Sequence, residues 1–213
     1  MSITLIIVIL TCIVSIVAFN NDKIKADLIF WPAVIQNNRQ YFRFISYGFV
    51  HADYIHLSFN MLSLYSFGSF IENDLFSGPY FFGEKGKVIF LIMYLGALIV
   101  STIPDYIKYR GIYGYTALGA SGAVSAVIFA GIILQPQMPI TLLFIQNIPG
   151  YIFGILFLGI SAYLAKKGTG NIGHMAHFIG ALFGLVFTIV VVKFFAVSHN
   201  DVLGDFIKSV FRR

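Results

Sequence analysis

The sequence predicts an all-α membrane protein, a polytopic bundle of six transmembrane helices within one domain. Hydrophobic residues make up 58% of the 213 residues, charged residues only 11%, and the mean hydropathy is +0.85. Soluble domains of this length do not have such a composition. The stretch 111–165 contains no Asp, Glu, Lys or Arg. Polar side chains also occur on three separate apolar segments, and they must converge within one bundle to find partners.

Three spans are predicted in the first half of the chain. A helix needs about 20 mostly apolar residues to cross about 30 Å of hydrocarbon. The segment 3–19 precedes the first charged residue, 54–72 ends on Glu72, and 88–104 lies between two charged residues. Each of these segments approaches the required length.

The long uncharged stretch exceeds the length of one span. Proline removes a helical hydrogen bond and ends or kinks a helix. The prolines that interrupt the stretch are Pro136, Pro139 and Pro149, the last followed by Gly150. Two spans result, at about 119–134 and 152–165, and a sixth follows at about 171–195.

The alternative interpretation of the first predicted span is a cleaved signal peptide. It lacks a preceding basic region, and no small-x-small cleavage site precedes Asn20, so we expect a retained helix. Cys12, the only cysteine, lies in this span, and a single cysteine excludes an internal disulfide.

The connection 20–53 is predicted to lie in the membrane interface. Its aromatic residues interleave with Arg39 and Arg43, and aromatic rings favour the level of the lipid headgroups. Nucleic-acid binding is the competing interpretation of basic and aromatic residues together. Too few cations cluster here for that role, so we expect no nucleic-acid partner.

The tail 199–213 is predicted to form a short basic amphipathic helix on the bilayer surface. Its apolar residues recur at helical spacing beside Lys208, Arg212 and Arg213. A basic C-terminus favours the cytoplasmic side. With six spans the N-terminus shares that side, and in a bacterium the chain would occupy the inner membrane.

The serine of Gly119-Ala120-Ser121-Gly122 is the candidate nucleophile, because it opens the fourth predicted helix within charge-free sequence. At a helix N-terminus the unpaired N–H groups and the positive dipole end favour an anion such as a tetrahedral oxyanion. Alone, this tetrapeptide is a weak signal, since small-residue helix contacts often produce such strings.

The second span carries a polar row. His56, Asn60, Leu64, Gly68 and Glu72 follow one another in steps of four and share one helix face. Polar groups in hydrocarbon are costly unless paired, so this face should point into the bundle. There, His56 and Asn60 can donate to an oxyanion, although a purely structural seam is the alternative. Glu72 ends a helix where the dipole disfavours an anion, so it needs a donor from a neighbouring helix or loop.

The sixth span places an imidazole within a seam of small residues. Gly173, His177, Gly180 and Gly184 are spaced by four, three and four residues. The matching stripe on the fourth span consists of Gly122, Ala126 and Ala130. Docking the two seams would bring His177 towards Ser121, although spacing alone leaves the register open by one helical turn.

Taken in order, these motifs resemble those of the rhomboid intramembrane serine proteases in their basic six-helix form. The resemblance covers nearly the whole chain, and several motifs in register argue against chance similarity. Its signatures are Phe42-Arg43 in place of the usual Trp-Arg, His56-Leu57-Ser58-Phe59-Asn60, Gly68 to Glu72, Gly119-Ala120-Ser121-Gly122, and Ala176-His177-Phe178-Ile179-Gly180 followed by Gly184.

The resemblance implies a catalytic dyad, with Ser121 as nucleophile and His177 as general base and then general acid. It implies that His56, Asn60 and the Ser121 amide hold the oxyanion. The residues with implied supporting roles are Gly119, Gly122, Gly180, Gly184, Arg43 and Glu72. The residues themselves agree with a dyad, because none of the nine carboxylates falls within the last three spans. One departure is Ser125, where the family usually has Phe or Tyr stacking on the imidazole.

His174 and His177 lie one turn apart and could bind a metal ion together. No Cys or carboxylate nearby completes a tetrahedral set, and a haem held by two histidines has as little support. We therefore expect neither a metal nor a cofactor.

We expect an intramembrane serine endopeptidase that cleaves a peptide bond in or near the transmembrane helix of another membrane protein. Water must reach Ser121, so a wet cavity should open to the outer face, with the Gly-rich linker 167–173 as a flexible cap. Substrate should approach laterally, beside the fifth span. Two alternatives stay open: an inactive relative that binds transmembrane helices, and a transporter or proton relay that uses the histidines.

Overall fold

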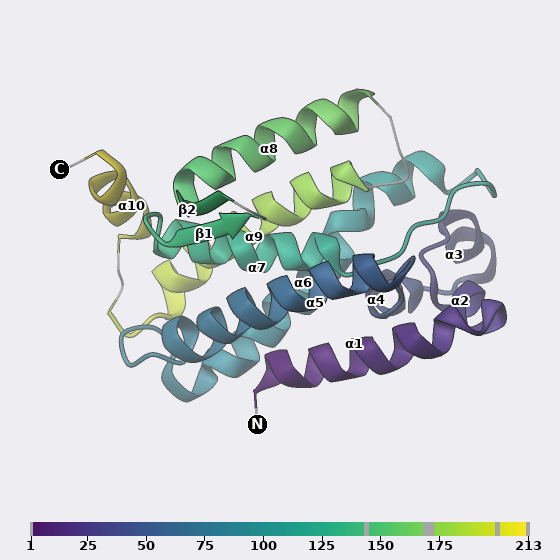
Figure 1. Cartoon of the computed structure of the whole chain (residues 1–213), viewed down its shortest axis with the longest axis horizontal. Helices are drawn as coiled ribbons and strands as arrows, with labels where there is room; N and C mark the ends of the chain where they lie inside the picture. Colours follow the sequence, from purple (N-terminus) through teal and green to yellow (C-terminus); the bar gives the residue numbers. More distant parts are fainter. Residues whose placement is uncertain (1, 143–144, 168–172, 199–200, 212–213) are drawn as a thin grey trace.

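The structure is a computed structural model that describes residues 2–142, 145–167, 173–198 and 201–211. Its longer helices run along one common axis and pack against one another (Figure 1). Six of the described helices occupy the regions of the predicted spans. They are α1 (Ile3–Phe19), α5 (Tyr54–Ser69), α6 (Gly86–Tyr109), α7 (Ser121–Leu134), α8 (Gly150–Lys167) and α9 (His174–Phe195). Residues 171–172 of the sixth predicted span lie outside the described residues.

Helix length and composition fit a membrane fold. Within the described residues, the helical stretches Gly83–Tyr109, Gly150–Lys167 and His174–Phe195 are long and apolar enough to cross a bilayer. α1 and α7 are shorter apolar helices. α5 gains length because it continues directly into a π-helical segment, η2 (Phe70–Phe76), which carries Glu72.

Glu72 binds the start of α1. Its buried carboxylate accepts hydrogen bonds from the Ser2 hydroxyl at 2.7 Å and from the backbone N–H groups of Ile3 and Thr4 at 2.8 and 2.7 Å. The first N–H groups of a helix have no partner within it, and the dipole at this end favours an anion. The donors that Glu72 is predicted to need therefore come from the start of α1. These hydrogen bonds hold α1 against the end of the second span.

α7 is the central helix of the bundle. It packs against α5, α6 and α9, and eleven of its 14 residues are buried. Small residues dominate its first half, and small residues let neighbouring helices approach closely. Ser121 is the first residue of α7. The candidate nucleophile thus stands where the most buried helix begins.

The connection 20–53 is folded. It contains α2 (Asp22–Leu28), α3 (Pro32–Asn38), α4 (Arg43–Ser46) and the 3₁₀ turn η1 (Tyr47–Phe49). The Arg43 guanidinium is buried and donates to the carbonyl oxygens of Ala26 and Ile29, each at 2.8 Å, and to the Gln40 side chain at 2.7 Å. These bonds tie α4 to the residues around the end of α2. Arg43 thus links parts of this segment to one another. Its supporting role for the site and the position of the segment in the membrane interface stay predictions.

α6 passes through Pro104 to Tyr109, beyond the predicted end at residue 104. A proline inside a helix removes one hydrogen bond of the ladder, and transmembrane helices tolerate this loss when neighbouring groups compensate. Asp105, the charge expected to end the span, accepts a hydrogen bond from the Tyr115 hydroxyl at 2.7 Å. The charge is therefore satisfied within the fold and does not stop the helix.

A short antiparallel hairpin joins α7 to α8, where the sequence suggests only helix breakers. Strands β1 (Pro139–Leu142) and β2 (Ile145–Pro149) pair Ile140 with Ile148 and place their prolines opposite each other at one end. Proline is tolerated at a strand end because its missing N–H costs little there. Among the described residues this hairpin is the only sheet.

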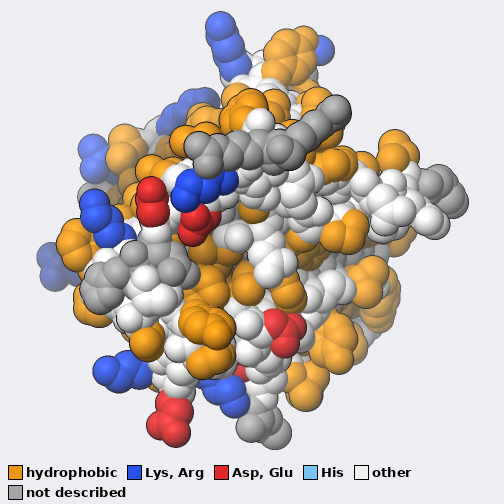
Figure 2. All heavy atoms as spheres, turned by 90° about the vertical axis from the view of Figure 1, so that its left-hand side faces the viewer, with side chains coloured by type: hydrophobic (Ala, Val, Ile, Leu, Met, Phe, Trp, Pro, Cys, Tyr) orange, Lys and Arg blue, Asp and Glu red, His pale blue; other side chains and the backbone are white. Residues whose placement is uncertain are grey.

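α10 (Val202–Phe211), preceded along the chain by α9, packs against the ends of α7 and α9. Leu203, Ile207 and Phe211 are spaced by four residues and are 50%, 55% and 78% exposed. Figure 2 looks onto this end of the molecule and shows hydrophobic side chains beside Lys and Arg side chains. The helix has the predicted amphipathic character, while its placement on a bilayer stays a prediction. Residues 199–200 and 212–213 of the predicted tail lie outside the described residues.

Candidate active site

The turn that precedes Ser121 depends on Gly119. This residue has a φ of +107°, a conformation that favours glycine. A Cβ atom added to it would lie 2.7 Å from Cε1 of the His56 ring. Gly119 is therefore required both by the backbone and by the close approach of His56. Ala120 then caps α7, and Ser121 follows with a backbone N–H that has no partner within the helix.

Residues of the folded connection hold this turn in place. Phe30 and Ala117 exchange two backbone hydrogen bonds of 2.9 Å, and the Gly119 N–H donates to the Tyr47 carbonyl at 3.0 Å. The Ala120 N–H donates to Nε2 of His51 at 3.4 Å. The sequence motifs do not reveal these contacts, because Phe30, Ala117 and Tyr47 take part in them through backbone atoms. Only His51 carried a possible signal, a buried imidazole five residues before His56.

The protonation of His51 follows from its partners. The Ser15 hydroxyl donates to the Phe49 carbonyl at 2.8 Å and lies 3.0 Å from Nδ1 of His51. Its oxygen therefore accepts the proton of Nδ1, which leaves Nε2 as the acceptor for Ala120. Burial lowers the pKa of His51 to about 3, with the neighbouring His56 adding to the effect. His51 is thus neutral at pH 7 and can accept a backbone hydrogen bond.

The two small-residue seams meet, with Gly180 against Gly122 and Gly184 against Ala126. A Cβ atom on Gly180 would lie 2.1 Å from the carbonyl oxygen of Gly122, and one on Gly184 would lie 2.2 Å from that of Ala126. Real Cβ atoms do not approach a backbone this closely. α9 and α7 therefore pack backbone against backbone, and only glycine fits at positions 180 and 184.

This seam brings His177 to Ser121. Nε2 of His177 lies 2.6 Å from Oγ of Ser121, within the range of a hydrogen bond. The serine hydroxyl donates to Nε2 when the imidazole is neutral and carries its proton on Nδ1. Both side chains are partly buried. No described carboxylate accepts a hydrogen bond from the His177 ring, so the pair has the geometry of a dyad.

The structure brings His56 beside the turn and Asn60 one helical turn away from it. The Ala52 N–H donates to Nδ1 of His56 at 3.5 Å, which leaves the proton on Nε2 as a possible donor. Asn60 is buried, and its side-chain amide donates one N–H to the His56 carbonyl at 3.0 Å. The α5 helix that carries both residues packs against α7. Their predicted contact with an oxyanion stays a prediction.

Two aromatic rings, those of Phe157 and His174, neighbour the His177 imidazole. Ser125 contributes no ring, and its hydroxyl donates to the Ser121 carbonyl at 2.8 Å within α7. The ring of Phe157, on α8, lies 6.2 Å from the imidazole, and the ring of His174 lies 6.1 Å from it. Sequence reasoning missed Phe157, since a phenylalanine in an apolar helix carries no distinguishing signal.

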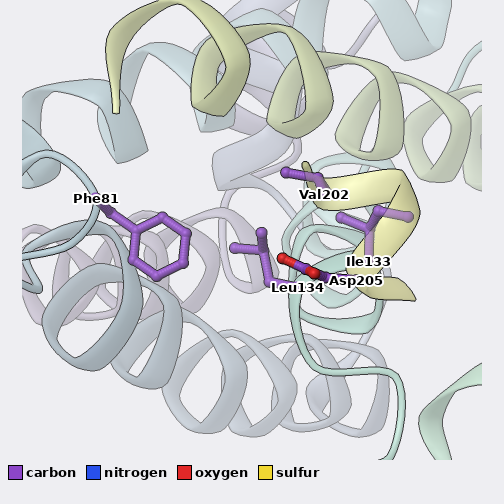
Figure 3. Close-up of a pocket in the computed structure, with 5 residues that line it drawn as sticks. All are labelled: Phe81, Ile133, Leu134, Val202 and Asp205. Atoms are coloured by element: carbon purple, nitrogen blue, oxygen red, sulfur yellow. The ribbon is translucent and has the colours of Figure 1, made fainter. Parts of the chain in front are cut away.

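Among the described residues, no three His, Cys, Asp or Glu side chains come together as a metal site would require. A cavity of about 50 Å³ lies between α10, the end of α7 and Phe81 (Figure 3). It lies against Leu134, at the opposite end of α7 from Ser121. This cavity is therefore separate from the candidate site. The wet cavity at Ser121 stays a prediction, and residues 168–172 of the predicted cap lie outside the described residues.

Comparison with known proteins gives one consistent match. The Rhomboid domain family matches residues 38–194. RHOMBOID-like protein 12, mitochondrial, from Arabidopsis thaliana is 32% identical over 148 residues, which cover 64% of this chain and 42% of that protein. Rhomboid protease GlpG from Haemophilus influenzae is 26% identical over 160 residues, covering 75% of this chain and 74% of that protein. Rhomboid protease GluP from Bacillus subtilis is 27% identical over 144 residues, covering 68% of this chain but 25% of that protein.

Proposed function

The chain belongs to the rhomboid family of multi-pass membrane proteins, and we propose that it is an intramembrane serine endopeptidase with Ser121 and His177 as its catalytic dyad. Membership confirms the predicted polytopic helical membrane fold. The observation that carries the proposal is the 2.6 Å separation between Nε2 of His177 and Oγ of Ser121 at the start of a buried helix. A nucleophile and a base within hydrogen-bond reach are what acyl transfer requires.

The reaction begins when Oγ of Ser121 attacks the carbonyl carbon of the scissile peptide bond and Nε2 of His177 takes the hydroxyl proton. The carbonyl oxygen becomes an oxyanion beside the free N–H of Ser121, with the side chains of His56 and Asn60 as further donors. His177 then gives its proton to the leaving amine, and an acyl-enzyme forms. Water, deprotonated by His177, attacks the ester and releases the second product.

The substrates proposed are transmembrane segments of other membrane proteins. A helical amide is shielded by its own hydrogen bonds, so a substrate helix must unwind locally before Ser121 can reach a carbonyl carbon. Lateral approach beside α8 is supported by the packing of that helix, because only Gly150, Gly154 and Ser161 are buried along it. We place both termini in the cytoplasm and the Ser121 end of α7 towards the outer face, in the inner membrane if the organism is bacterial.

Cleavage of a single-span substrate protein by the purified chain in lipid vesicles tests the proposal. Wild type should cleave, while Ser121→Ala and His177→Ala should not. Ser125→Ala is the matched control, because it removes the same hydroxyl one turn further along α7 and should cleave like wild type. Cleavage that persists in both dyad variants would rule out Ser121 and His177 as the catalytic pair.

A fluorophosphonate probe separates an active enzyme from an inactive relative that binds transmembrane helices. The probe reacts with activated serines and should label wild type and Ser125→Ala but not Ser121→Ala. Substrate binding without cleavage, together with an unlabelled Ser121, would favour the binding protein over the enzyme.

A further inference from the structure

We infer that Phe157 on α8 is a positioning residue for the His177 imidazole, so that the packing of α8 sets the orientation of the general base. This inference rests on the proposed function. The ring centroids of Phe157 and His177 lie 6.2 Å apart with planes inclined by 33°. Aromatic pairs interact favourably at centroid separations of about 4.5 to 7 Å. The ring is therefore close enough to restrict the imidazole.

The position on α7 from which the family usually supports the imidazole cannot do so in this chain. It is occupied by Ser125, a short side chain whose hydroxyl is bound to the Ser121 carbonyl at 2.8 Å. No described carboxylate accepts a hydrogen bond from the imidazole either. The orientation of the imidazole then depends on packing against its neighbours, and the apolar one among the ring neighbours is Phe157.

Phe157 is itself held by two other rings. Phe129 of α7 lies 5.5 Å from it at 52°, and Phe153, one turn earlier on α8, lies 5.7 Å from it at 29°. Phe157 is the central ring of this cluster, because Phe129, Phe153 and the His177 imidazole each pair with it. A displacement of α8 would therefore be transmitted to the base through ring contacts.

Among the six spans, α8 also has the fewest buried residues. Its outward side chains, such as Ile155 at 69% and Leu156 at 56% exposure, face away from the bundle, and its buried positions are Gly150, Gly154 and Ser161. If a substrate helix passes beside α8, the movement that admits it also loosens Phe157 from His177. The base would then be fully oriented only after α8 has packed back. This couples substrate access to the chemical step.

The test compares Phe157→Leu with Phe157→Tyr, using Phe153→Leu as the matched control on the same helix. Loss of the ring should lower kcat about five- to tenfold, the rate equivalent of one aromatic pair, and leave KM within about twofold. Phe157→Tyr keeps the ring and should restore most of kcat. Phe153→Leu leaves the contacts of Phe157 with His177 and Phe129 in place and should change kcat by about twofold at most.

Labelling by a fluorophosphonate separates positioning from gating, because a small probe does not require a substrate helix to pass α8. The labelling rate of Ser121 should fall in Phe157→Leu by about the same factor as kcat. An unchanged or faster labelling rate would overturn the inference and make Phe157 a gate residue only. Thermal unfolding in detergent checks that the variant is folded, and Phe157→Met, whose unbranched side chain adapts to irregular space, replaces it if it is not. Failure of wild type to label or cleave would instead contradict the proposed function.

Discussion

α8 and α9 both pack against α7, but they do so in different ways. α9 approaches so closely that a Cβ atom on Gly180 would lie 2.1 Å from a backbone carbonyl of α7. α8 also has a buried glycine facing α7, yet a Cβ atom on Gly154 would lie 3.4 Å from the side chains of Ile132 and Phe129, an ordinary contact. One neighbour of α7 is locked by its backbone, and the other rests on side chains.

This difference separates two requirements of the site. The proposed dyad needs a fixed distance between Ser121 and His177, since small displacements of reacting groups cost large factors in rate. A backbone seam provides that distance because it cannot slide without steric overlap. A substrate needs access, and a helix held by side chains can be displaced at lower cost. The predictions below test this division.

The largest effect is expected from Gly180→Ala. The added methyl group must displace the backbone of Gly122, and overpacking of this kind costs about 1 to 3 kcal/mol or more. Separation of α9 from α7 should also abolish cleavage. Thermal unfolding in detergent and the vesicle cleavage assay measure the two effects. The control is Gly159→Ala on α8, where a Cβ atom would meet nothing within 4 Å. A fully active, fully stable Gly180→Ala protein would contradict the seam.

Glu72→Ala tests a second locked contact, the one between α1 and the second span. The substitution leaves the N–H groups of Ile3 and Thr4 without their acceptor and removes three hydrogen bonds to a carboxylate. Hydrogen bonds to charged groups contribute about 1.5 to 3 kcal/mol each, so we expect a loss of stability of at least about 2 kcal/mol. Glu84, an exposed carboxylate in the turn η3 (Gly83–Lys85), serves as control, and Glu84→Ala should unfold like wild type.

A smaller, pH-dependent effect is expected from His51, which holds the turn before Ser121. Its pKa of about 3 in the folded chain lies below the ordinary value near 6.5, so the unfolded chain binds the proton more readily between these values. The stability that neutral His51 contributes is complete above pH of about 6.5 and declines as the pH falls, by up to about 1.4 kcal/mol per pH unit. His51→Gln should therefore lose stability less steeply between pH 6.5 and 5. Parallel melting curves for the two proteins would refute this role.

The smallest effect is expected from Gly154→Ala. The new methyl group finds ordinary contacts against Ile132 and Phe129, and alanine is a better helix former than glycine by up to about 1 kcal/mol. Stability should be unchanged or slightly raised, and cleavage should persist. A loss as severe as that of Gly180→Ala would mean that α8 is locked like α9 and would break the comparison.

Sequence patterns predicted the parts of this fold that depend on residue type and spacing. The seam of Gly180 and Gly184 could be paired with that of Gly122 because small residues mark close helix contacts. The need of Glu72 for a hydrogen-bond donor from a neighbouring segment likewise followed from helix dipoles. What could not be predicted rests on backbone atoms and on apolar packing. The Tyr47 carbonyl that accepts from Gly119 is a backbone group, so no residue type marks it in the sequence. The strands β1 and β2 were not predicted, because their prolines were interpreted only as helix breakers.

Phe157 illustrates the same limit at the candidate site. Ser125 showed in the sequence that the usual aromatic support was missing, but not which of the chain's 23 phenylalanines replaced it. That choice depends on how α8 is rotated against α7 and α9, and a helix that is apolar on all sides gives no periodicity from which to read its rotation.

The short length of α7 determines how deep Ser121 lies in the bilayer. Its 14 residues rise by about 1.5 Å each and span about 21 Å, against a hydrocarbon thickness of about 30 Å. With its Leu134 end level with one hydrocarbon boundary, Ser121 lies about 9 Å below the other boundary. A substrate cut at that level would be severed about six residues inside its own membrane segment. Under the proposed function, the length of this one helix would thus set which part of a substrate stays in the bilayer and which is released.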